Sequence, residues 1–126
     1  MELRVARHTN DISRILDFYT KIIGFDLLGE FKNHDNYDGI FLGKKNENWH
    51  LEFTTSIEQA NHYSDEDDCL VFYVNTKNEY DEIIHRIHQN NISIINSKNP
   101  YWNLNGVTIK DPDGFNVIIS PLKISN

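Results

Sequence analysis

Asp111-Pro112-Asp113-Gly114 lies between two alternating apolar stretches near the end of the chain, Val107-Thr108-Ile109-Lys110 and Phe115-Asn116-Val117-Ile118-Ile119. A Pro-Asp-Gly turn between period-two segments is typical of a β-hairpin. Proline sets the first turn angle, and glycine supplies the positive φ that closes the turn. We therefore expect two antiparallel strands here.

Outward from this hairpin, the chain repeats one pattern of strands and a helix. In the first copy, Asn10-Asp11 offers an N-cap, and Gly24 is expected to end the helix in a left-handed conformation. In the second, Thr76 and Glu79 form a capping box, and Asn91 is the expected C-cap. The expected strands are 3–9, 25–31, 38–43 and 49–54, then 69–74, 92–95, 107–110 and 115–120.

The two copies keep a nearly constant offset, which is 65 residues from Asn10 to Asn75 and 66 from Glu52 to Ile118. This offset indicates an internal duplication of a βαβββ unit and predicts the α+β class. The predicted organisation is a single domain over residues 1–126, with modules at 1–57 and 68–126 and a polar connection at 58–67.

Composition excludes several classes of function. The 126 residues are 39% hydrophobic and carry a net charge of −7, which disfavours nucleic acid and anionic membranes as partners. No apolar run approaches the ~20 residues that span a bilayer, and no secretory signal follows Met1. The single cysteine, Cys69, excludes an internal disulfide, so we expect a cytoplasmic protein.

Several markers together resemble a known superfamily. Asp11, Phe18-Tyr19 and Gly24-Phe25 resemble the first module of the vicinal oxygen chelate (VOC) superfamily, and Asp111-Pro112-Asp113-Gly114 resembles the end of its second module. This superfamily includes glyoxalase I, bleomycin- and fosfomycin-resistance proteins, extradiol dioxygenases and methylmalonyl-CoA epimerase. The resemblance implies two modules in a pseudo-twofold arrangement that form a concave mixed sheet, and a homodimer.

The resemblance also implies where a metal ion would be bound. The four ligand positions of the glyoxalase I pattern fall on Arg4, Glu52, Cys69 and Ile118. A catalytic divalent ion needs about three protein ligands. Arginine is permanently cationic and isoleucine has no lone pair, so we expect the usual metal site to be absent and no cofactor to be needed.

Strand alternation predicts which side chains face the concave surface. Arg4 and Glu52 have two interpretations that both stay open: a structural salt bridge in the vacated metal position, or a guanidinium that Glu52 holds for a ligand. Arg7 falls where an outward apolar residue is expected, which indicates a bulge or an error of register. The candidate binding residues are Arg4, His8, His50, Glu52, Cys69, Tyr73, Tyr101, Trp102 and Ile118.

The remaining candidates are weighed against ordinary structural roles. His34, His62, His85 and His88 are expected to be solvated surface histidines, whereas His8 and His50 should face the pocket. Cys69 lacks a pattern that would activate a thiolate and is expected to be a buried, inert thiol. Tyr101 and Trp102 lie in an expected loop bounded by Pro and Asn, where they either line a ligand pocket or anchor the loop.

These observations favour a small protein that binds a small organic molecule without a metal, and the resemblance implies that it is a homodimer. The alternative is a metal-dependent lyase or isomerase, or a dioxygenase, of the glyoxalase type. In it, Glu52 would be both ligand and general base, and His8 and His50 would complete a rearranged site for Zn, Ni, Mn or Fe. A third hypothesis is metal-free proton transfer by Glu52 or His50.

Overall fold

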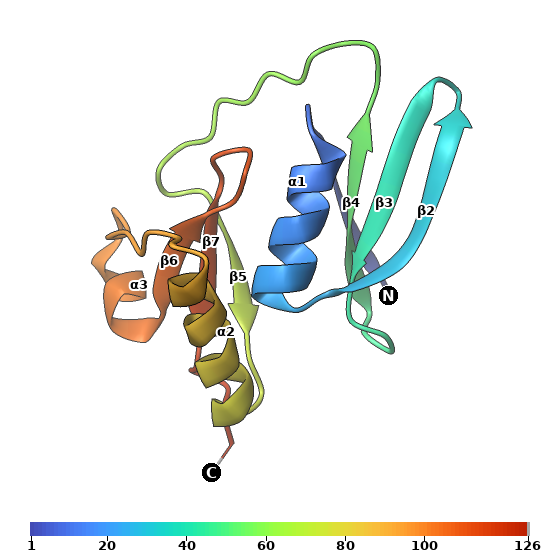
Figure 1. The fold of residues 1–126 in the computed structure, drawn as a ribbon. Helices are drawn as coiled ribbons and strands as arrows, with labels where there is room; N and C mark the ends of the chain where they lie inside the picture. Colours follow the sequence, from blue (N-terminus) through green and yellow to red (C-terminus); the bar gives the residue numbers. More distant parts are fainter. Residues whose placement is uncertain (126) are drawn as a thin grey trace. The chain divides into compact units, whose positions relative to one another are not determined.

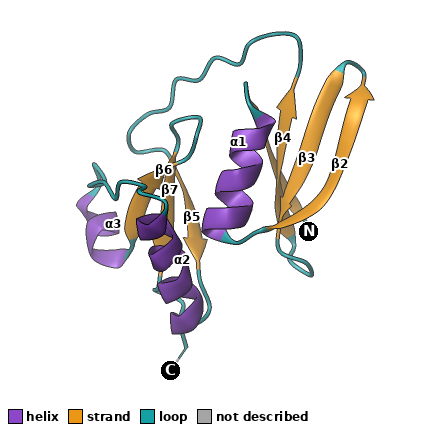
Figure 2. Ribbon diagram, in the orientation of Figure 1, coloured by secondary structure: helices purple, strands orange, loops and turns teal. Residues whose placement is uncertain are grey.

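The computed structural model describes residues 1–125 and comprises two compact units, Met1–His62 and a second that begins at Tyr63 (Figure 1). Each unit combines helices with one small sheet (Figure 2), which confirms the predicted α+β class. The elements are β1 (Leu3–His8), α1 (Ile12–Asp17), η1 (Phe18–Ile23), β2 (Asp26–His34), β3 (Tyr37–Gly43), β4 (Trp49–Thr55), β5 (Cys69–Tyr73), α2 (Lys77–Gln89), α3 (Pro100–Asn105), β6 (Val107–Lys110) and β7 (Asn116–Ser120).

The sheet of the first unit has the strand order β1-β4-β3-β2. Strand β1 runs parallel to β4, and the other pairs are antiparallel. In the parallel pair, Arg4 lies opposite His50 and Ala6 lies opposite Glu52. Because side chains alternate between the two faces of a strand, this register places Arg4, His50 and Glu52 on one face, as the sequence predicts.

The helix of the first unit begins where the sequence indicates. The Asp11 side chain accepts a hydrogen bond from the Arg14 backbone N–H at 3.1 Å. Helix α1 continues into the π-helical turn η1, and Gly24 ends it in the left-handed conformation with φ 91° and ψ 23°. Tyr19 is fully buried and its ring stacks on Phe53 with 5.3 Å between centroids. The helix therefore covers the sheet face that carries Phe53.

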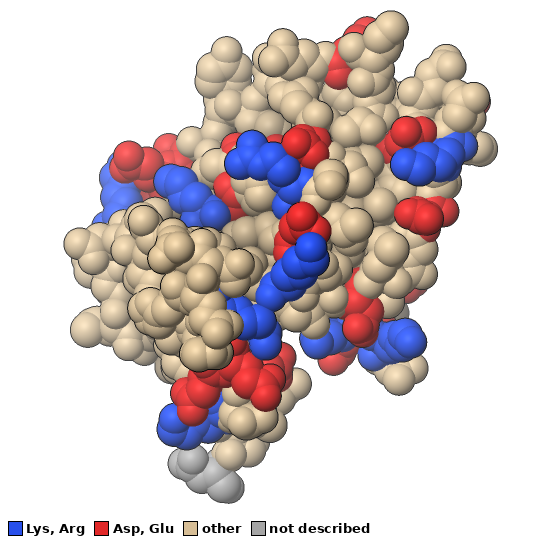
Figure 3. All heavy atoms as spheres, in the orientation of Figure 1, with Lys and Arg blue, Asp and Glu red and all other residues tan. Residues whose placement is uncertain are grey.

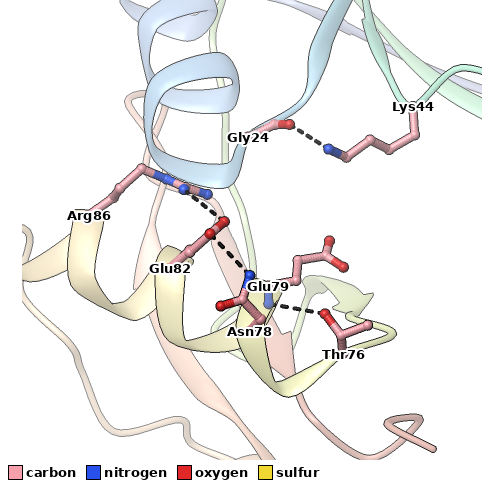
Figure 4. Close-up of polar contacts among 7 residues, drawn as sticks. All are labelled: Gly24, Lys44, Thr76, Asn78, Glu79, Glu82 and Arg86. Carbon is pink, nitrogen blue, oxygen red and sulfur yellow. Dashed lines mark hydrogen bonds and ion pairs between the residues drawn. The ribbon is translucent and has the colours of Figure 1, made fainter.

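Lys44, in the turn between β3 and β4, is tied to the end of this helix. Its Nζ donates to the Gly24 carbonyl at 2.7 Å (Figure 4). The last carbonyls of a helix lack partners within the helix, and a cation there is favourable. This bond anchors the turn that leads into β4.

Arg7 lies on the helix-covered face without distorting the strand. It pairs in register with Phe53, and its guanidinium carbon lies 5.2 Å from the centroid of the Phe53 ring. The β1–β4 register shows no shift, so the bulge or register error that the sequence indicated is wrong. The arginine stem covers the edge of the apolar core while its cation lies over an aromatic ring.

In the second unit the strand order is β5-β7-β6, with β5 parallel to β7. Strands β6 and β7 form the predicted antiparallel hairpin. In its turn, the Asp111 N–H donates to the Phe115 carbonyl at 2.9 Å, and Gly114 has a φ of 89°. The turn residues thus do what their chemistry predicts.

Helix α2 starts with the predicted cap. The Thr76 hydroxyl accepts from the Glu79 N–H at 3.1 Å, and the Glu79 carboxylate accepts from the Asn75 N–H at 3.5 Å. One turn later, the Glu82 carboxylate accepts from the Asn78 amide and pairs with Arg86 (Figure 4). Ile83 and Ile87 are buried on the apolar side of the helix.

The segment between α2 and β6 differs from the prediction. The expected strand 92–95 is reduced to a single bridge between Ile95 and Thr108. The expected loop around Tyr101 is the short helix α3, because Asn99 caps it and Pro100 suits its first position. The Asn103 side chain bonds both the N–H and the carbonyl of Ser97. These backbone groups are therefore satisfied locally instead of by a neighbouring strand.

Charged side chains of both signs lie next to one another on the face shown in Figure 3. The ion pairs of the structure include Lys21 with Asp17 at 3.1 Å and Lys77 with Asp81 at 2.7 Å. None of the helices within residues 1–125 is both long and apolar enough to cross a membrane.

Candidate functional site

The candidate site is the face of the first sheet that lies opposite α1 and η1. Strand alternation assigns its members, because Leu42, Leu51 and Phe53 are buried on the helix side. We call this surface the Arg4 face. Its residues are Arg4, Ala6 and His8 on β1, His50, Glu52 and Thr54 on β4, Tyr37, Gly39, Phe41 and Gly43 on β3, and Gly29 and Phe31 on β2.

Arg4 is held by two side chains of the neighbouring strand. Its Nε donates to His50 Nε2 at 2.9 Å, and its Nη1 lies 3.8 Å from Glu52 Oε2. Because Nε2 accepts this bond, His50 is neutral and carries its proton on Nδ1. The Arg4 side chain is 53% exposed and that of Glu52 is 15% exposed. The cation of the pair is therefore the accessible partner.

An aromatic ring completes the contacts of Arg4. Its guanidinium carbon lies 4.9 Å from the centroid of Phe41, and His50 meets the same ring edge-on at 5.8 Å. Phe31 lies beyond Phe41, with 5.8 Å between the two centroids. A cation over an aromatic face is attracted by the ring quadrupole. The guanidinium thus has partners from β3 and β4, and two aromatic rings extend away from it.

Glycines on β2 and β3 allow these rings to lie close to the backbone. A Cβ at Gly39 would clash with the Phe31 ring, and one at Gly29 would lie 3.4 Å from Phe41 Cδ2. A Cβ at Gly43 would lie 3.5 Å from the backbone of His50. Glycine thus lies at the positions where a larger residue would collide with a neighbouring ring, and the aromatic rings of the Arg4 face pack directly against the glycine backbone.

His8 lies at the other end of β1, in a separate set of contacts. Its Nε2 is 3.0 Å from Ser56 Oγ, and its ring meets Tyr37 edge-on at 6.2 Å. His62, which the sequence placed in solvent, is half-buried, and its Nε2 is 2.6 Å from the His8 carbonyl oxygen. The carbonyl at the end of β1 provides the partner that local sequence could not reveal.

The segment that follows β4 is also bound to this end of β1. The Asn10 side chain makes two hydrogen bonds with the backbone of Ala60, at 2.7 and 3.1 Å. An amide side chain that pairs with both backbone groups of one residue imitates a strand partner. Residues of the predicted connection are therefore part of the first unit as far as His62.

The residues of the Arg4 face do not fit a divalent metal. The lone pair of His50 Nε2 accepts from Arg4, His8 Nε2 is bonded to Ser56, and Glu52 is paired with a cation. Within residues 1–125, no three His, Cys, Asp or Glu side chains are grouped as a metal ion requires. The rearranged triad of His8, His50 and Glu52 is therefore not assembled, since the two histidines lie in different clusters.

In the second unit, strands β5 and β7 pair in parallel and in register. Cys69 pairs with Asn116, and Tyr73 pairs with Ser120. Ile118 is 1% exposed, so its side chain belongs to the core of the structure. Burial and the neighbouring acids Asp68 and Asp67 raise the pKa of the Cys69 thiol. A thiol of this kind is a poor nucleophile.

Tyr101 and Trp102 lie on α3 instead of in a loop. Their rings pack edge-to-face with 4.8 Å between centroids, and Tyr101 is 51% exposed. Both belong to the second unit, together with Cys69, Tyr73 and Ile118. Their participation in a ligand site stays a prediction.

Sequence reasoning did not single out Phe41 and Phe31. The signal for Phe41 was present in the alternation of β3, because this residue pairs directly with Glu52. Phe31 pairs with Gly39, and a glycine opposite an aromatic residue is a recognisable cross-strand pattern. The contact of Phe41 with Arg4 could not be found this way, because Arg4 reaches Phe41 across β4.

Comparison with known families covers most of this chain. Residues 3–54 match the YycE-like N-terminal domain, and residues 67–120 match the YycE-like C-terminal domain. The chain belongs to the YycE-like family. The uncharacterised protein YycE of Bacillus subtilis (strain 168) is 36% identical to it over 121 residues, which cover 93% of this chain and 85% of the relative. The crystal structure of a Bacillus subtilis YycE protein of unknown function has a TM-score of 0.84 at 33% identity, covering 99% of this chain and 90% of that one.

Two more distant structures place this YycE-like chain in a wider group. The trypanothione-dependent glyoxalase I of Leishmania major has a TM-score of 0.73 at 19% identity, covering 95% of this chain and 85% of that one. TnmS3, an antibiotic-binding protein of Streptomyces sp. CB03234, has a TM-score of 0.67 at 18% identity, covering 95% and 93%. At these identities the likeness shows the fold alone, and this fold is the one that the resemblance to the VOC superfamily implied.

Proposed function

We propose that this YycE-like protein binds a small organic molecule on the Arg4 face without a divalent metal. The observation that carries the proposal is the guanidinium of Arg4, which lies between His50, Glu52 and Phe41 and is still 53% exposed. A positive charge held at this position repels a metal ion and offers hydrogen-bond donors to a ligand. The proposal rests on the first unit alone.

The glyoxalase-type alternative requires Glu52 and His50 as metal ligands, but both side chains already contact Arg4. Glu52 would have to leave Arg4 before it could bind an ion or remove a proton, and His50 would have to lose the bond from Arg4. Replacing a partner of a charged hydrogen bond costs roughly 1.5–3 kcal/mol. The contacts therefore favour binding over metal-dependent catalysis.

The likeness to other proteins supports binding as a class of function. TnmS3 is an antibiotic-binding protein with this fold, and the fold hosts both enzymes and binding proteins. The homodimer and the cytoplasmic location are also part of this proposal.

The test is the metal content of untagged protein, followed by thermal shifts with zinc, nickel and manganese and then with a library of small molecules. We expect no stoichiometric metal, and stabilisation by some organic compounds in the presence of a chelator. Stoichiometric metal that is lost in Glu52→Ala would contradict the proposal. So would ligand binding that requires an added metal.

A further inference from the structure

The sign of the charge that a ligand meets on the Arg4 face follows from exposure. Among the described strand residues assigned to this face, Arg4 is the one lysine or arginine, and Glu52 is the one carboxylate. The Arg4 side chain is 53% exposed, whereas that of Glu52 is 15% exposed and faces Arg4. The accessible charge is therefore positive, although the whole chain carries a net charge of −7.

Most N–H groups of the Arg4 guanidinium make no hydrogen bond within the described part of the chain. Arginine carries five N–H groups, and in the described part of the chain the hydrogen bond to His50 uses only the one on Nε. The 3.8 Å between Nη1 and Glu52 Oε2 is longer than a hydrogen bond of about 3.2 Å or less. The two Nη groups together match the fork geometry that carboxylates and phosphonates accept.

The guanidinium is also oriented in advance. His50 holds Nε, Glu52 attracts Nη1, and the ring of Phe41 lies against the guanidinium at 4.9 Å. A side chain that is already held loses little conformational entropy when it binds a ligand. His50 is a positioning residue in this arrangement, because it acts on a ligand through Arg4.

Next to the guanidinium lies an apolar platform. The rings of Phe41 and Phe31 are both half-buried, with 5.8 Å between centroids and 44° between their planes. They lie over Gly29 and Gly39, which leave the rings close to the sheet. Aromatic surfaces of this size pack well against another planar group.

From these contacts we infer that the ligand is a small organic oxyanion, a carboxylate or a phosphonate, attached to a planar apolar group. The oxyanion pairs with the Nη groups of Arg4, and the planar group packs on Phe41 and Phe31. This inference rests on the proposed function and names its ligand class.

The experiment uses 15N-labelled full-length protein in the presence of a chelator and at constant ionic strength. Three probes share one ring: benzoate, phenylphosphonate and the neutral benzamide. We expect benzoate or phenylphosphonate to shift the amide signals of β1 and β4 and the Arg4 Nε–H signal saturably. Benzamide should bind at least tenfold more weakly, since a charged hydrogen bond contributes more than the ~1.4 kcal/mol that a factor of ten represents.

Matched variants separate the role of Arg4 from a general effect of charge. Arg4→Gln should remove the tenfold preference for the oxyanion, whereas Arg7→Gln, on the same strand but the opposite face, should keep it. Glu52→Gln should bind the oxyanion at least as tightly as the natural chain, because a repelling carboxylate is removed. His50→Leu should weaken binding, and His50→Gln, which keeps an acceptor, should restore most of it.

The outcomes distinguish this inference from the proposed function. Equal affinities for benzamide and benzoate on this face would overturn the inference that the ligand is an oxyanion. Equal losses of affinity in the Arg4 and Arg7 variants would overturn it as well. Both results would leave the proposal of metal-free binding unaffected. No saturable shift with either anion overturns it as well. Binding of any probe only after manganese or zinc is added would contradict the proposed function itself. A preference between the two anions would show whether the group is a carboxylate or a phosphonate.

Discussion

The ion pair between Arg4 and Glu52 should contribute little to the stability of the fold. At 3.8 Å, the Coulomb attraction is about 1 kcal/mol in a water-like medium and about 4 kcal/mol at an effective dielectric of 20. The 53% exposure of Arg4 places the pair near the lower value. Measured exposed pairs contribute ~0.2–1 kcal/mol, so the expected coupling energy is below about 1 kcal/mol.

A double-mutant cycle measures this coupling directly. Arg4→Leu should lower the free energy of unfolding by about 1–2 kcal/mol, because it also removes the hydrogen bond to His50 at 2.9 Å. Glu52→Gln should cost less than about 1 kcal/mol, since the amide keeps the shape of the side chain. The free energies come from urea unfolding followed by circular dichroism, with m-values required to stay constant.

The pair of Lys77 and Asp81 on α2 is the matched control. Its atoms are closer, at 2.7 Å, but its side chains are 80% and 55% exposed, and such helix pairs contribute ~0.3–0.5 kcal/mol. A coupling above about 3 kcal/mol between Arg4 and Glu52 would refute the reasoning, because it is the value of a buried structural pair. A small coupling would mean that the ion pair with Glu52 is not what holds the fold together.

Three further predictions concern other parts of the chain. Gly106→Ala should destabilise the protein by about 1–3 kcal/mol in urea unfolding, because its Cβ would lie 2.6 Å from the Ile119 carbonyl oxygen; Gly29→Ala, with a 3.4 Å contact, should cost less, and equal losses would contradict the steric argument. Thr76→Ala should cost about 1 kcal/mol through loss of the α2 cap, and an unchanged unfolding midpoint would contradict it. The alkylation rate of Cys69 should rise at higher pH than the rate for the unfolded chain, which is the control. Burial and acidic neighbours raise the pKa of this thiol, so less thiolate is present at a given pH. A rate that rises at the same or a lower pH than in the control would contradict this prediction.

Local sequence was sufficient for features that depend on neighbours along the chain. The Asp111–Gly114 turn, the cap at Thr76 and the left-handed Gly24 follow from which backbone groups lack partners and which residues tolerate positive φ. Alternation along β1 and β4 predicted which side chains share a face of each strand, and the register between the two strands agrees with it. Each of these features involves a short loop or a period that the chain itself displays.

Features that depend on distant partners could not be predicted in the same way. The apolar residues of 92–95 indicated a strand, but in the described part of the chain this segment meets β6 only at the bridge between Ile95 and Thr108. His62 was expected in solvent, yet its Nε2 lies within hydrogen-bond distance of the His8 carbonyl oxygen, 54 residues earlier in the chain. In both cases the partner lies on another element, so its position depends on the folded chain.

The sequence by itself determined the two alternating faces of β1 and β4, the hairpin of β6 and β7 and the helix caps, because strand periodicity, turn chemistry and capping are local properties. Only the tertiary structure decided which charge of the Arg4–Glu52 pair is accessible and which ring lies beside it. Exposure and stacking depend on how β1, β3 and β4 lie side by side, and Arg4 reaches Phe41 across a whole strand. That arrangement makes the Arg4 face a candidate site for an anion.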